Sequence, residues 1–424
     1  MEKKYSDVLE LVRAGITGTN AKLSETPEWD EICSLLIKGK MLTVVYRTVA
    51  ALGENYGLTK ERLLEWQKET FAKGVKQLQM VNELRTVLTE AQNRKIRTVV
   101  FKGITLAALY PEPYTRLSCD ADLLVRANQR EEMEQMLVRM GYEKIEAASK
   151  EHVPVYIIKT GNRQLKLEIH DLLWEDYEGK QAEILQNMRL DAEETLICQD
   201  VCGIQVTTLG YNEHLIYQMF HIVKHFFFEG IPLRYFTDIA LYIDAYADKL
   251  DFVKVRKEME RLHYGQFFDS VMKICYQCLG MKTNVLGNRL DKVELSERLL
   301  KEVLEIGKLN KSVKQWESIN FLSHYFMRTS KTKSTNFQQR RKQLLPMPSE
   351  LNDRFSYAKK CPLLLPVAWV HRVFYMIGYA RHCKRNGMKT TESLEKAQYR
   401  LDLMRELGLT ETDKEVQDLL SNED

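Results

Sequence analysis

Two aspartates stand one residue apart at the start of an apolar run. In the segment CDADLLV, Asp120 and Asp122 precede large aliphatic side chains, a pattern that predicts a buried β-strand. Alternate side chains of a strand point to the same face, so the two carboxylates are expected side by side. Like charges at that spacing repel each other unless a cation lies nearby. The pair therefore indicates either a metal site or carboxylates at an exposed strand end that pair with Lys102 and Arg116.

A second strand-like segment offers a third carboxylate. In LKLEIHDLL the same alternation places Lys166, Glu168 and His170 on one face of a strand. If this strand pairs with the one that carries the aspartates, three carboxylates meet, and such hard oxygen ligands suit Mg²⁺ or Mn²⁺ rather than zinc. Magnesium held by carboxylates usually accompanies a phosphate substrate. For Lys166 and His170 we expect supporting contacts around that metal site.

The segment FKG, residues 101–103, favours an anion in the same region. It ends a β-branched run and opens a helix shortly before the aspartates. A helix that begins directly after a strand presents backbone N–H groups to a negatively charged ligand. We therefore expect Lys102 and Gly103 to lie beside the phosphates of a substrate.

Basic residues recur on a later helix. His221, Lys224 and His225 are spaced three and four residues apart, so they share one helix face. In one interpretation Lys224 reaches a β- or γ-phosphate while a histidine contacts the substrate; in the other, this is a polar face at a cleft between domains. Two histidines at this spacing could also bind zinc, but no glutamate or cysteine at metal-ligand spacing accompanies them. Further on, Arg234 and Asp238 form either an ion pair within one helix or part of the substrate pocket.

The order of predicted elements indicates an α+β fold. Apolar residues recur at helical spacing before residue 95, and a β-branched run at 96–103 then opens a region of short strands and helices. In that region a helix is expected from an N-cap at Asn128 to a stop at Gly141. Two strand-like runs, 153–159 and 163–173, are joined by TGN, which favours a tight hairpin.

Helical periodicity returns at Tyr211 and continues through most of the remaining chain. A polar, basic stretch at 328–350 interrupts it and predicts an exposed loop or linker. We therefore expect four segments: N-terminal helices at 1–94, an α/β core at 95–210, a helical domain at 211–327 that closes a cleft over the core, and a linker with further helices at 328–424.

Composition excludes several classes of protein. Across 424 residues the formal net charge is only +3, so no overall electrostatic attraction to nucleic acid or anionic membrane is expected. The N-terminus has no apolar signal segment, and the apolar stretch at 361–382 contains Pro366, His371 and Arg372, which disfavour a membrane span. We predict a cytoplasmic protein without a transmembrane helix.

Eight cysteines are dispersed along the chain, and in a cytoplasmic protein they are expected as buried thiols. Two pairs could form a zinc site instead, Cys198 with Cys202 and Cys275 with Cys278. Neither pair is flanked by the tight turns that zinc knuckles use. Buried thiols are the preferred interpretation.

Taken together, these motifs carry a resemblance to a known family. The segment FKGITLAALYPEPYTRLSCDADLLV, the later LEIH and the helix containing HIVKH resemble the uncharacterised bacterial nucleotidyltransferases of the polymerase-beta superfold. Members show a KG, a tyrosine-proline step, an arginine, a D-x-D strand, an E-x-H strand and an H-x-x-K-H helix. The resemblance covers about residues 95–245. It departs from the superfold at Gly103-Ile104, where a serine usually follows the glycine; Thr105 or Lys102 would have to replace its contact.

The resemblance implies a Mg²⁺-dependent transfer of a nucleoside monophosphate from an NTP to a hydroxyl group, with release of pyrophosphate. Asp120 and Asp122 would hold the nucleotide-bound metal, and Glu168 would complete a second metal site. Arg116 would bind phosphate or brace its loop, and Asp238 would frame the nucleotide pocket. The acceptor, which could be a small molecule, a protein or RNA, and the oligomeric state are left open. The alternative is a non-catalytic binding module that retains this fold.

Overall fold

The computed structural model describes residues 2–145, 153–161, 163–174, 179–228, 230–305, 357–358, 362–371 and 390–409. The chain divides into two compact units, one formed by residues 1–226 and 230–307, the other by 227–229 and 308–424. The predicted linker at 328–350 lies outside the described residues, as does part of the apolar stretch at 361–382. In the described part of the chain, no helix combines the length and apolar character that crossing a membrane requires.

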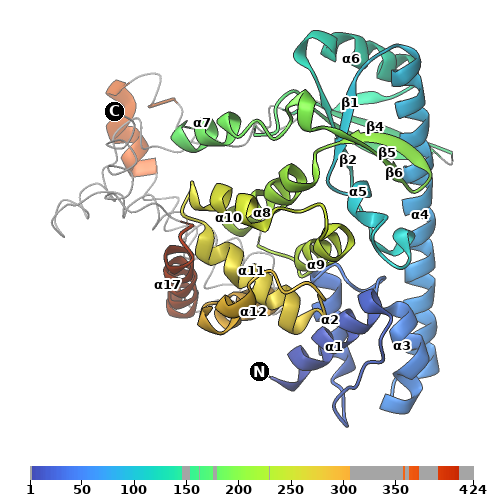
Figure 1. The fold of residues 1–424 in the computed structure, drawn as a ribbon, viewed down its shortest axis with the longest axis vertical. Helices are drawn as coiled ribbons and strands as arrows, with labels where there is room; N and C mark the ends of the chain where they lie inside the picture. Colours follow the sequence, from blue (N-terminus) through green and yellow to red (C-terminus); the bar gives the residue numbers. More distant parts are fainter. Residues whose placement is uncertain are drawn as a thin grey trace. The chain divides into compact units, whose positions relative to one another are not determined.

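Helices precede the sheet, as the sequence predicts: α1 (Lys3–Thr17), α2 (Trp29–Lys38), α3 (Tyr46–Leu52) and α4 (Lys60–Asn93). The longest is α4, which begins where the Thr59 side chain accepts a hydrogen bond from the Arg62 amide. Its buried positions recur every three or four residues, from Gly74 to Ala91, so one side of the helix packs on the sheet. Figure 1 shows α4 running along the sheet and beyond it.

The central sheet is small and mixed. Its five strands are β1 (Thr98–Phe101), β2 (Ala121–Val125), β3 (Glu143–Ile145), β4 (Val155–Thr160) and β5 (Arg163–His170). They lie in the order β1-β2-β5-β4-β3, and within this sheet the pairing of β2 with β5 is parallel while the other pairs are antiparallel. The predicted hairpin is confirmed: β4 and β5 are joined through Gly161, whose φ of 59° suits glycine. An α+β fold is thus confirmed.

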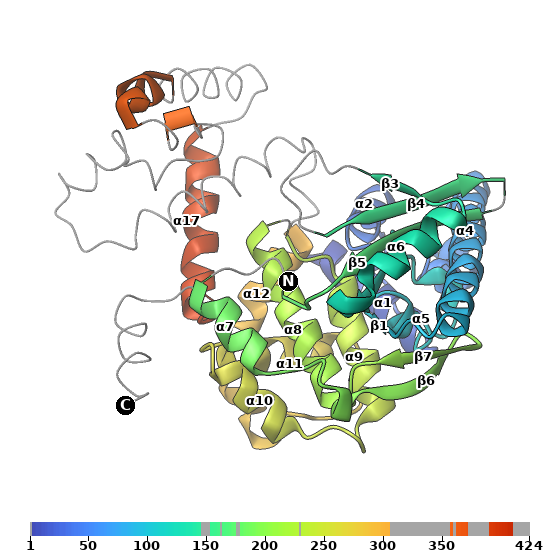
Figure 2. The ribbon, with the colours of Figure 1, turned by 90° about the horizontal axis from the view of Figure 1, so that it is seen from above.

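The two faces of the sheet differ in chemistry. Alternate residues of β2 and β5, such as Leu123 and Leu167, point into an apolar core that α4 and α6 (Arg130–Arg139) cover. The other alternation places Asp122, Glu168 and His170 on the opposite face. Figure 2 shows α4 and α6 beside the sheet. The apolar face holds the fold together, and the polar face is left for chemistry.

Three features of this region differ from the sequence prediction or go beyond it. Helix α6 begins at Arg130 after a 3-10 turn, Ala127–Gln129, so its N-cap is Gln129 and not Asn128. Strand β3 extends the sheet at its edge beyond β4. A separate hairpin of β6 (Ile197–Val201) and β7 (Ile204–Thr208) adds Val201, Ile204 and Val206 to the apolar core.

Helices resume at Tyr211, as predicted. The remaining described helices are α5 (Ile104–Ala107), α7 (Gly179–Asn187), α8 (Tyr211–Phe228), α9 (Arg234–Tyr246), α10 (Phe252–Glu260), α11 (Gly265–Cys278), α12 (Ser296–Glu305) and α17 (Thr390–Glu406). The other 3-10 turns are Gly53–Tyr56, Pro113–Thr115, Glu193–Thr195, Gly287–Lys292 and Pro362–Leu364. For the site, α8 and α9 matter most, because Tyr217 of α8 lies near Lys102 and Asp238 of α9 pairs with Arg116.

Candidate active site

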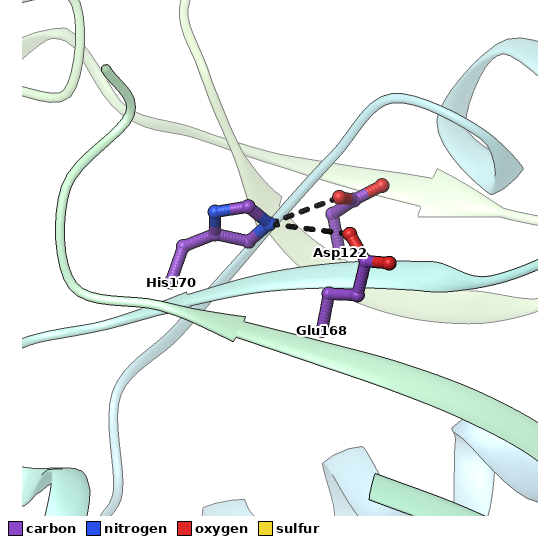
Figure 3. Close-up of side chains that lie close together, drawn as sticks. All are labelled: Asp122, Glu168 and His170. Carbon is purple, nitrogen blue, oxygen red and sulfur yellow. Dashed lines mark hydrogen bonds and ion pairs between the residues drawn. The ribbon is translucent and has the colours of Figure 1, made fainter. Parts of the chain in front are cut away.

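The parallel pairing of β2 with β5 brings acids from distant parts of the chain together. Asp122 lies directly opposite Glu168 in the register of the two strands. Together with His170 they form a compact group, in which one ligand atom of each side chain lies within 4.8 Å of the others. His170 Nε2 is 3.0 Å from Asp122 Oδ1 and 3.9 Å from Glu168 Oε2 (Figure 3). Two of the three predicted carboxylates therefore converge, with a histidine between them.

Asp120 reaches this group through a lysine. It stands one residue before β2, and its side chain keeps 33% of its surface exposed. Lys166 Nζ lies 3.5 Å from Asp120 Oδ2 and 2.6 Å from Glu168 Oε1. Lys166 thus bridges the third carboxylate to the group of Asp122, Glu168 and His170.

Asp122 is held differently, by a buried ion pair. Lys102 Nζ donates to Asp122 Oδ1 at 2.8 Å, and the residue Asp122 is only 5% exposed. Burial alone would raise the pKa of Asp122, but Lys102 and His170 hold it well below its ordinary value. Burial also lowers the pKa of Lys102, yet Asp122 and Tyr217 more than offset this and raise it well above normal. Both groups of the pair are therefore charged at neutral pH.

The surroundings of Asp120 disfavour its charged form. Burial, and then the neighbouring carboxylates Asp122 and Glu168, raise its pKa. The pKa of Lys166 is raised because Glu168 and Asp120 outweigh the effect of burial. In the described ion pairs these three carboxylates contact the ammonium groups of Lys102 and Lys166, and their oxygens are hard ligands. This donor set fits Mg²⁺ or Mn²⁺.

Helix α8 lines the other side of the acids. The Tyr217 ring lies 5.3 Å from that of Phe101 and 5.7 Å from Lys102 Nζ. One turn further on, His221 stacks on Tyr217 at 6.0 Å. Burial, and then the charge of Lys102, lower the pKa of His221 well below normal. His221, the first residue of the basic helix face predicted from the sequence, therefore lies near Lys102.

The other two residues of that face continue along α8. His225 Nε2 is 3.1 Å from His221 Nε2. Lys224 is half-buried, and its charge contributes to the lowered pKa of His221. No cysteine or carboxylate joins the two histidines in a metal-binding group among the described residues. The zinc interpretation of this pair finds no further ligand there.

Arg116 and Asp238 form a pair that the sequence did not predict. Arg116 donates two hydrogen bonds to the Asp238 carboxylate, at 3.1 and 2.7 Å, and is only 3% exposed. Tyr110 also donates to Asp238. Arg234 instead donates to the backbone carbonyl of Leu117, so the expected ion pair within α9 is wrong. Arg116 and Asp238 brace the loop before the aspartates from within.

The turn after β1 is tight and strained. Lys102 and Gly103 both have positive φ angles, 66° and 37°. The helix that follows, α5, has four residues, so the expected row of helical N–H groups for an anion is reduced to a single turn. Thr105 donates its hydroxyl to the Lys102 carbonyl. Ser118 Oγ lies beside Gly103, 3.2 Å from where a Cβ would stand, and provides a hydroxyl that sequence reasoning missed.

The cysteine pairs do not form a zinc site. Cys198 and Cys202 belong to the β6–β7 hairpin, whereas Cys275 and Cys278 belong to α11. In the described part of the chain these thiols join no metal-binding group. Cys275 is buried as expected, but Cys119 and Cys198 are exposed, which corrects the prediction for these two residues.

Of the comparisons with known proteins, the family model is the one that assigns the chain to a family. Residues 25–280 match a family model described as "Uncharacterised nucleotidyltransferase". No curated protein matches the chain. A solved structure, an antigenic nucleotidyltransferase-like protein from Paracoccidioides brasiliensis, is 14% identical over 52% of this chain and 93% of that chain, with a TM-score of 0.30. A TM-score this low is no measure of a shared fold.

Proposed function

Because the chain belongs to this family of uncharacterised nucleotidyltransferases, we propose that it transfers a nucleoside monophosphate from an NTP to a hydroxyl group and releases pyrophosphate. We place it in the polymerase-beta-like superfamily. The observation that carries the proposal is the parallel register of β2 and β5, which sets Asp122 opposite Glu168. Such a pair of acids on neighbouring strands is costly to keep unless it binds a cation.

The carboxylates of Asp120, Asp122 and Glu168 would hold Mg²⁺ or Mn²⁺. The metal, when bound, supplies positive charge that neutralises the phosphates of the nucleotide. His170 fixes the orientation of Asp122 through their 3.0 Å contact. Lys102 forms an ion pair with Asp122, and a metal ion bound to Asp122 would compete with Lys102 for this carboxylate. Lys102 would then be released to a phosphate oxygen.

The transfer itself needs few groups. The acceptor hydroxyl attacks the α-phosphorus, an O–P bond forms, the bond to the β-phosphate oxygen breaks, and the hydroxyl proton passes to a carboxylate or to water. Lys102, Lys224 and His221 supply donors for the phosphates from the side of α8. Gly103 permits close approach of the backbone, and Ser118 replaces the hydroxyl that Ile104 cannot provide.

A second candidate function is a binding module without catalysis. It is favoured by one observation: Lys102 pairs with Asp122, and Lys166 pairs with Asp120 and Glu168. In that case the two lysines would be permanent partners of the carboxylates. Nucleotide would then bind weakly or not at all, and metal would not change its affinity.

The experiment that separates the two candidates is a turnover assay. The purified chain is incubated with each labelled NTP, Mg²⁺ and cell extract, and both pyrophosphate and labelled acceptor are measured. We expect turnover with at least one NTP, its loss on chelation of the metal, and its loss in Asp120→Asn. The matched control is Glu132→Gln, an exposed acid on α6 away from the site, which should behave as wild type.

Two results would contradict the proposal. One is unchanged turnover in both Asp120→Asn and Glu168→Gln, since the acids would then play no part in it. The other is the absence of pyrophosphate release and of metal-dependent nucleotide binding with every NTP, which would favour the binding module.

A further inference from the structure

A cavity of about 490 Å³ lies beside the acids. Its walls come from separate parts of the chain: the end of α2 and the residues after it, the middle of α4, the loop before β2, strands β4 and β5, and the start of α9. All of these segments belong to the first compact unit. The volume lies in the range of pockets that bind small molecules.

The lining of this cavity is strongly basic. Six of its side chains carry positive charge: Lys40, Lys73, Lys76, Lys159, Lys166 and Arg234. No aspartate or glutamate lines it in the described part of the chain. The whole molecule carries a formal net charge of only +3, so this concentration of charge is local. Lys73 pairs with Glu69, and Lys166 pairs with Asp120 and Glu168. The net charge of the lining is positive all the same, which suits an anionic ligand.

Two buried polar groups of the lining lack partners. Arg234 is 7% exposed, and its Nε has no hydrogen-bond acceptor among the described residues. Gln77 is 3% exposed, and its Nε2 is likewise unsatisfied there. Unsatisfied buried donors are costly, and a buried guanidinium without a carboxylate is more so. A bound anion would supply an acceptor for the guanidinium of Arg234.

Burial, and then the charge of Arg116, lower the pKa of Arg234. In the loop before β2, the Arg234 side chain donates a hydrogen bond to the neutral backbone carbonyl of Leu117. Arg116, in contrast, has the carboxylate of Asp238 as its partner. Of these two neighbouring arginines, Arg234 is therefore the one whose charge is left for a ligand.

The cavity adjoins the acids on one particular side. Lys166 lines it and contacts Asp120 and Glu168. Strands β4 and β5 form part of its wall, whereas Lys102 and Gly103 follow β1, at the other end of the strand order. The groups proposed for the phosphates of the nucleotide on β1 and α8 therefore lie across the acids from the wall that β4 and β5 form. Ser118 lines the cavity and also lies beside Gly103, so the two sites adjoin each other at this residue.

We propose that this cavity binds the acceptor and that the acceptor is a small molecule carrying both a hydroxyl and a phosphate group. The inference rests on the proposed function and names its second substrate. Arg234 would bind the phosphate through its planar guanidinium, and Lys76 and Lys159 at the exposed rim would add charge. The hydroxyl of the same molecule would point along Lys166 towards Asp120 and Glu168.

Binding of two probes tests this inference without nucleotide or metal. Inorganic phosphate and ribose 5-phosphate are titrated into the full chain, with neutral ribose as the uncharged match. Lys76→Glu and Lys159→Glu place an acid at the exposed rim, where folding is little affected. The matched control is Lys68→Glu, an exposed lysine on the same helix α4 that does not line the cavity.

Ribose 5-phosphate is expected to bind and ribose is not. Each rim variant should weaken ribose 5-phosphate binding about tenfold, while Lys68→Glu leaves it unchanged. Binding of NTP with Mg²⁺ should stay the same in all three variants. Arg234→Met should abolish binding of both phosphate probes, with folding checked by circular dichroism.

Two outcomes overturn the inference. One is that neither phosphate probe binds, or that both bind to the rim variants as to wild type. The other is that NTP competes with ribose 5-phosphate and loses affinity in the same variants, which assigns the cavity to the phosphates of the nucleotide. Because the probes are measured alone, their binding supports the cavity even where pyrophosphate release fails, so the two proposals fail separately.

Discussion

Asp120 and Asp122 share a strand face, but their surroundings differ. Asp122 is buried and paired with Lys102 and His170. Asp120 is a third exposed, and its cation is Lys166, whose Nζ lies 3.5 Å from Asp120 Oδ2. The charge of Asp122 therefore balances a buried lysine. The charge of Asp120 adds to a group of carboxylates that already repel one another, as its raised pKa indicates.

Opposite effects on stability follow for the two asparagine variants. Asp122→Asn should lower the free energy of unfolding by about 3–5 kcal/mol, because Lys102 would be left buried without its counter-charge. Asp120→Asn should leave it unchanged or raise it slightly, since it removes repulsion. Urea unfolding of both variants without metal gives the comparison. Equal losses would show that the Lys102–Asp122 pair does not stabilise the fold.

His214 sets a pH dependence away from the acids. It is buried on α8, its Nε2 has no hydrogen-bond partner among the described residues, and burial lowers its pKa to about 4. In the unfolded chain its pKa is near 6.5, so below that pH the unfolded state binds the proton more readily. The stability due to neutral His214 is therefore complete above about pH 6.5 and decreases as the pH falls towards 4.

His214→Phe should remove this dependence. The phenyl ring keeps the edge contact with Tyr242, whose ring lies 5.2 Å away, but it cannot take up a proton. Between pH 8 and pH 5 the wild type should lose roughly 2 kcal/mol more than the variant. Urea unfolding at the two pH values measures the difference. The same loss in both proteins would mean that other groups dominate acid unfolding.

At the scale of elements, the sequence predicted which face of a strand a side chain lies on better than it predicted which strands pair. The two-residue period of a strand is geometric, so Asp122 and Glu168 could each be assigned to a polar face from the sequence alone. That β2 and β5 pair in parallel depends on the packing of α4 and α6, which no local pattern contains. The prediction of a metal site therefore depended on one assumption about pairing, which the register confirms.

Contacts over long distances in the sequence were not predictable in the same way. The spacing of Arg234 and Asp238 favoured a pair within α9, because that is the nearest opposite charge along a helix. Asp238 instead meets Arg116, which lies 122 positions earlier. Burial decides the choice, since the bidentate geometry compensates both desolvated charges. The basic cavity was missed for the same reason: its walls come from segments that only the fold brings together.

The turn between β1 and α5 can be tested with a pair of glycine variants. Gly103→Ala forces a Cβ into a left-handed backbone and within 3.2 Å of Ser118 Oγ. Gly57→Ala is the matched control, because its φ of 79° is also positive but no atom lies within 4 Å. Gly57→Ala should lose about 1 kcal/mol of stability from the backbone. Gly103→Ala should lose more, because its φ of 37° and ψ of −92° lie outside the left-handed helical region that Gly57 occupies.

Only Gly103→Ala should weaken binding of NTP, because Ser118 and the backbone beside it must move. Nucleotide affinity of the two variants, measured at a temperature where both are folded, shows the difference. A similar affinity in both would place the phosphates away from this turn.

At the scale of the whole molecule, the described residues of the candidate site lie in one unit. The acids, the α8 face up to Phe226 and the basic cavity all belong to the first compact unit, with residues 1–226 and 230–307. The range that matches the family model, 25–280, falls within the same unit apart from residues 227–229. Its apolar core is formed by α4, α6, the sheet and the β6–β7 hairpin, all in that unit.

A fragment of residues 1–307 should therefore fold and keep the binding properties of the full chain. It contains every described residue of the site and the complete core that positions them, so its affinities for NTP with Mg²⁺ and for ribose 5-phosphate should match those of the full chain. Titrations of both proteins, with one cooperative urea transition as the check on folding, give the answer. If the fragment is folded but binds neither ligand, residues after 307 contribute groups to the site. If it loses only ribose 5-phosphate, they contribute to the cavity for the acceptor, and the acids with α8 are sufficient for the nucleotide.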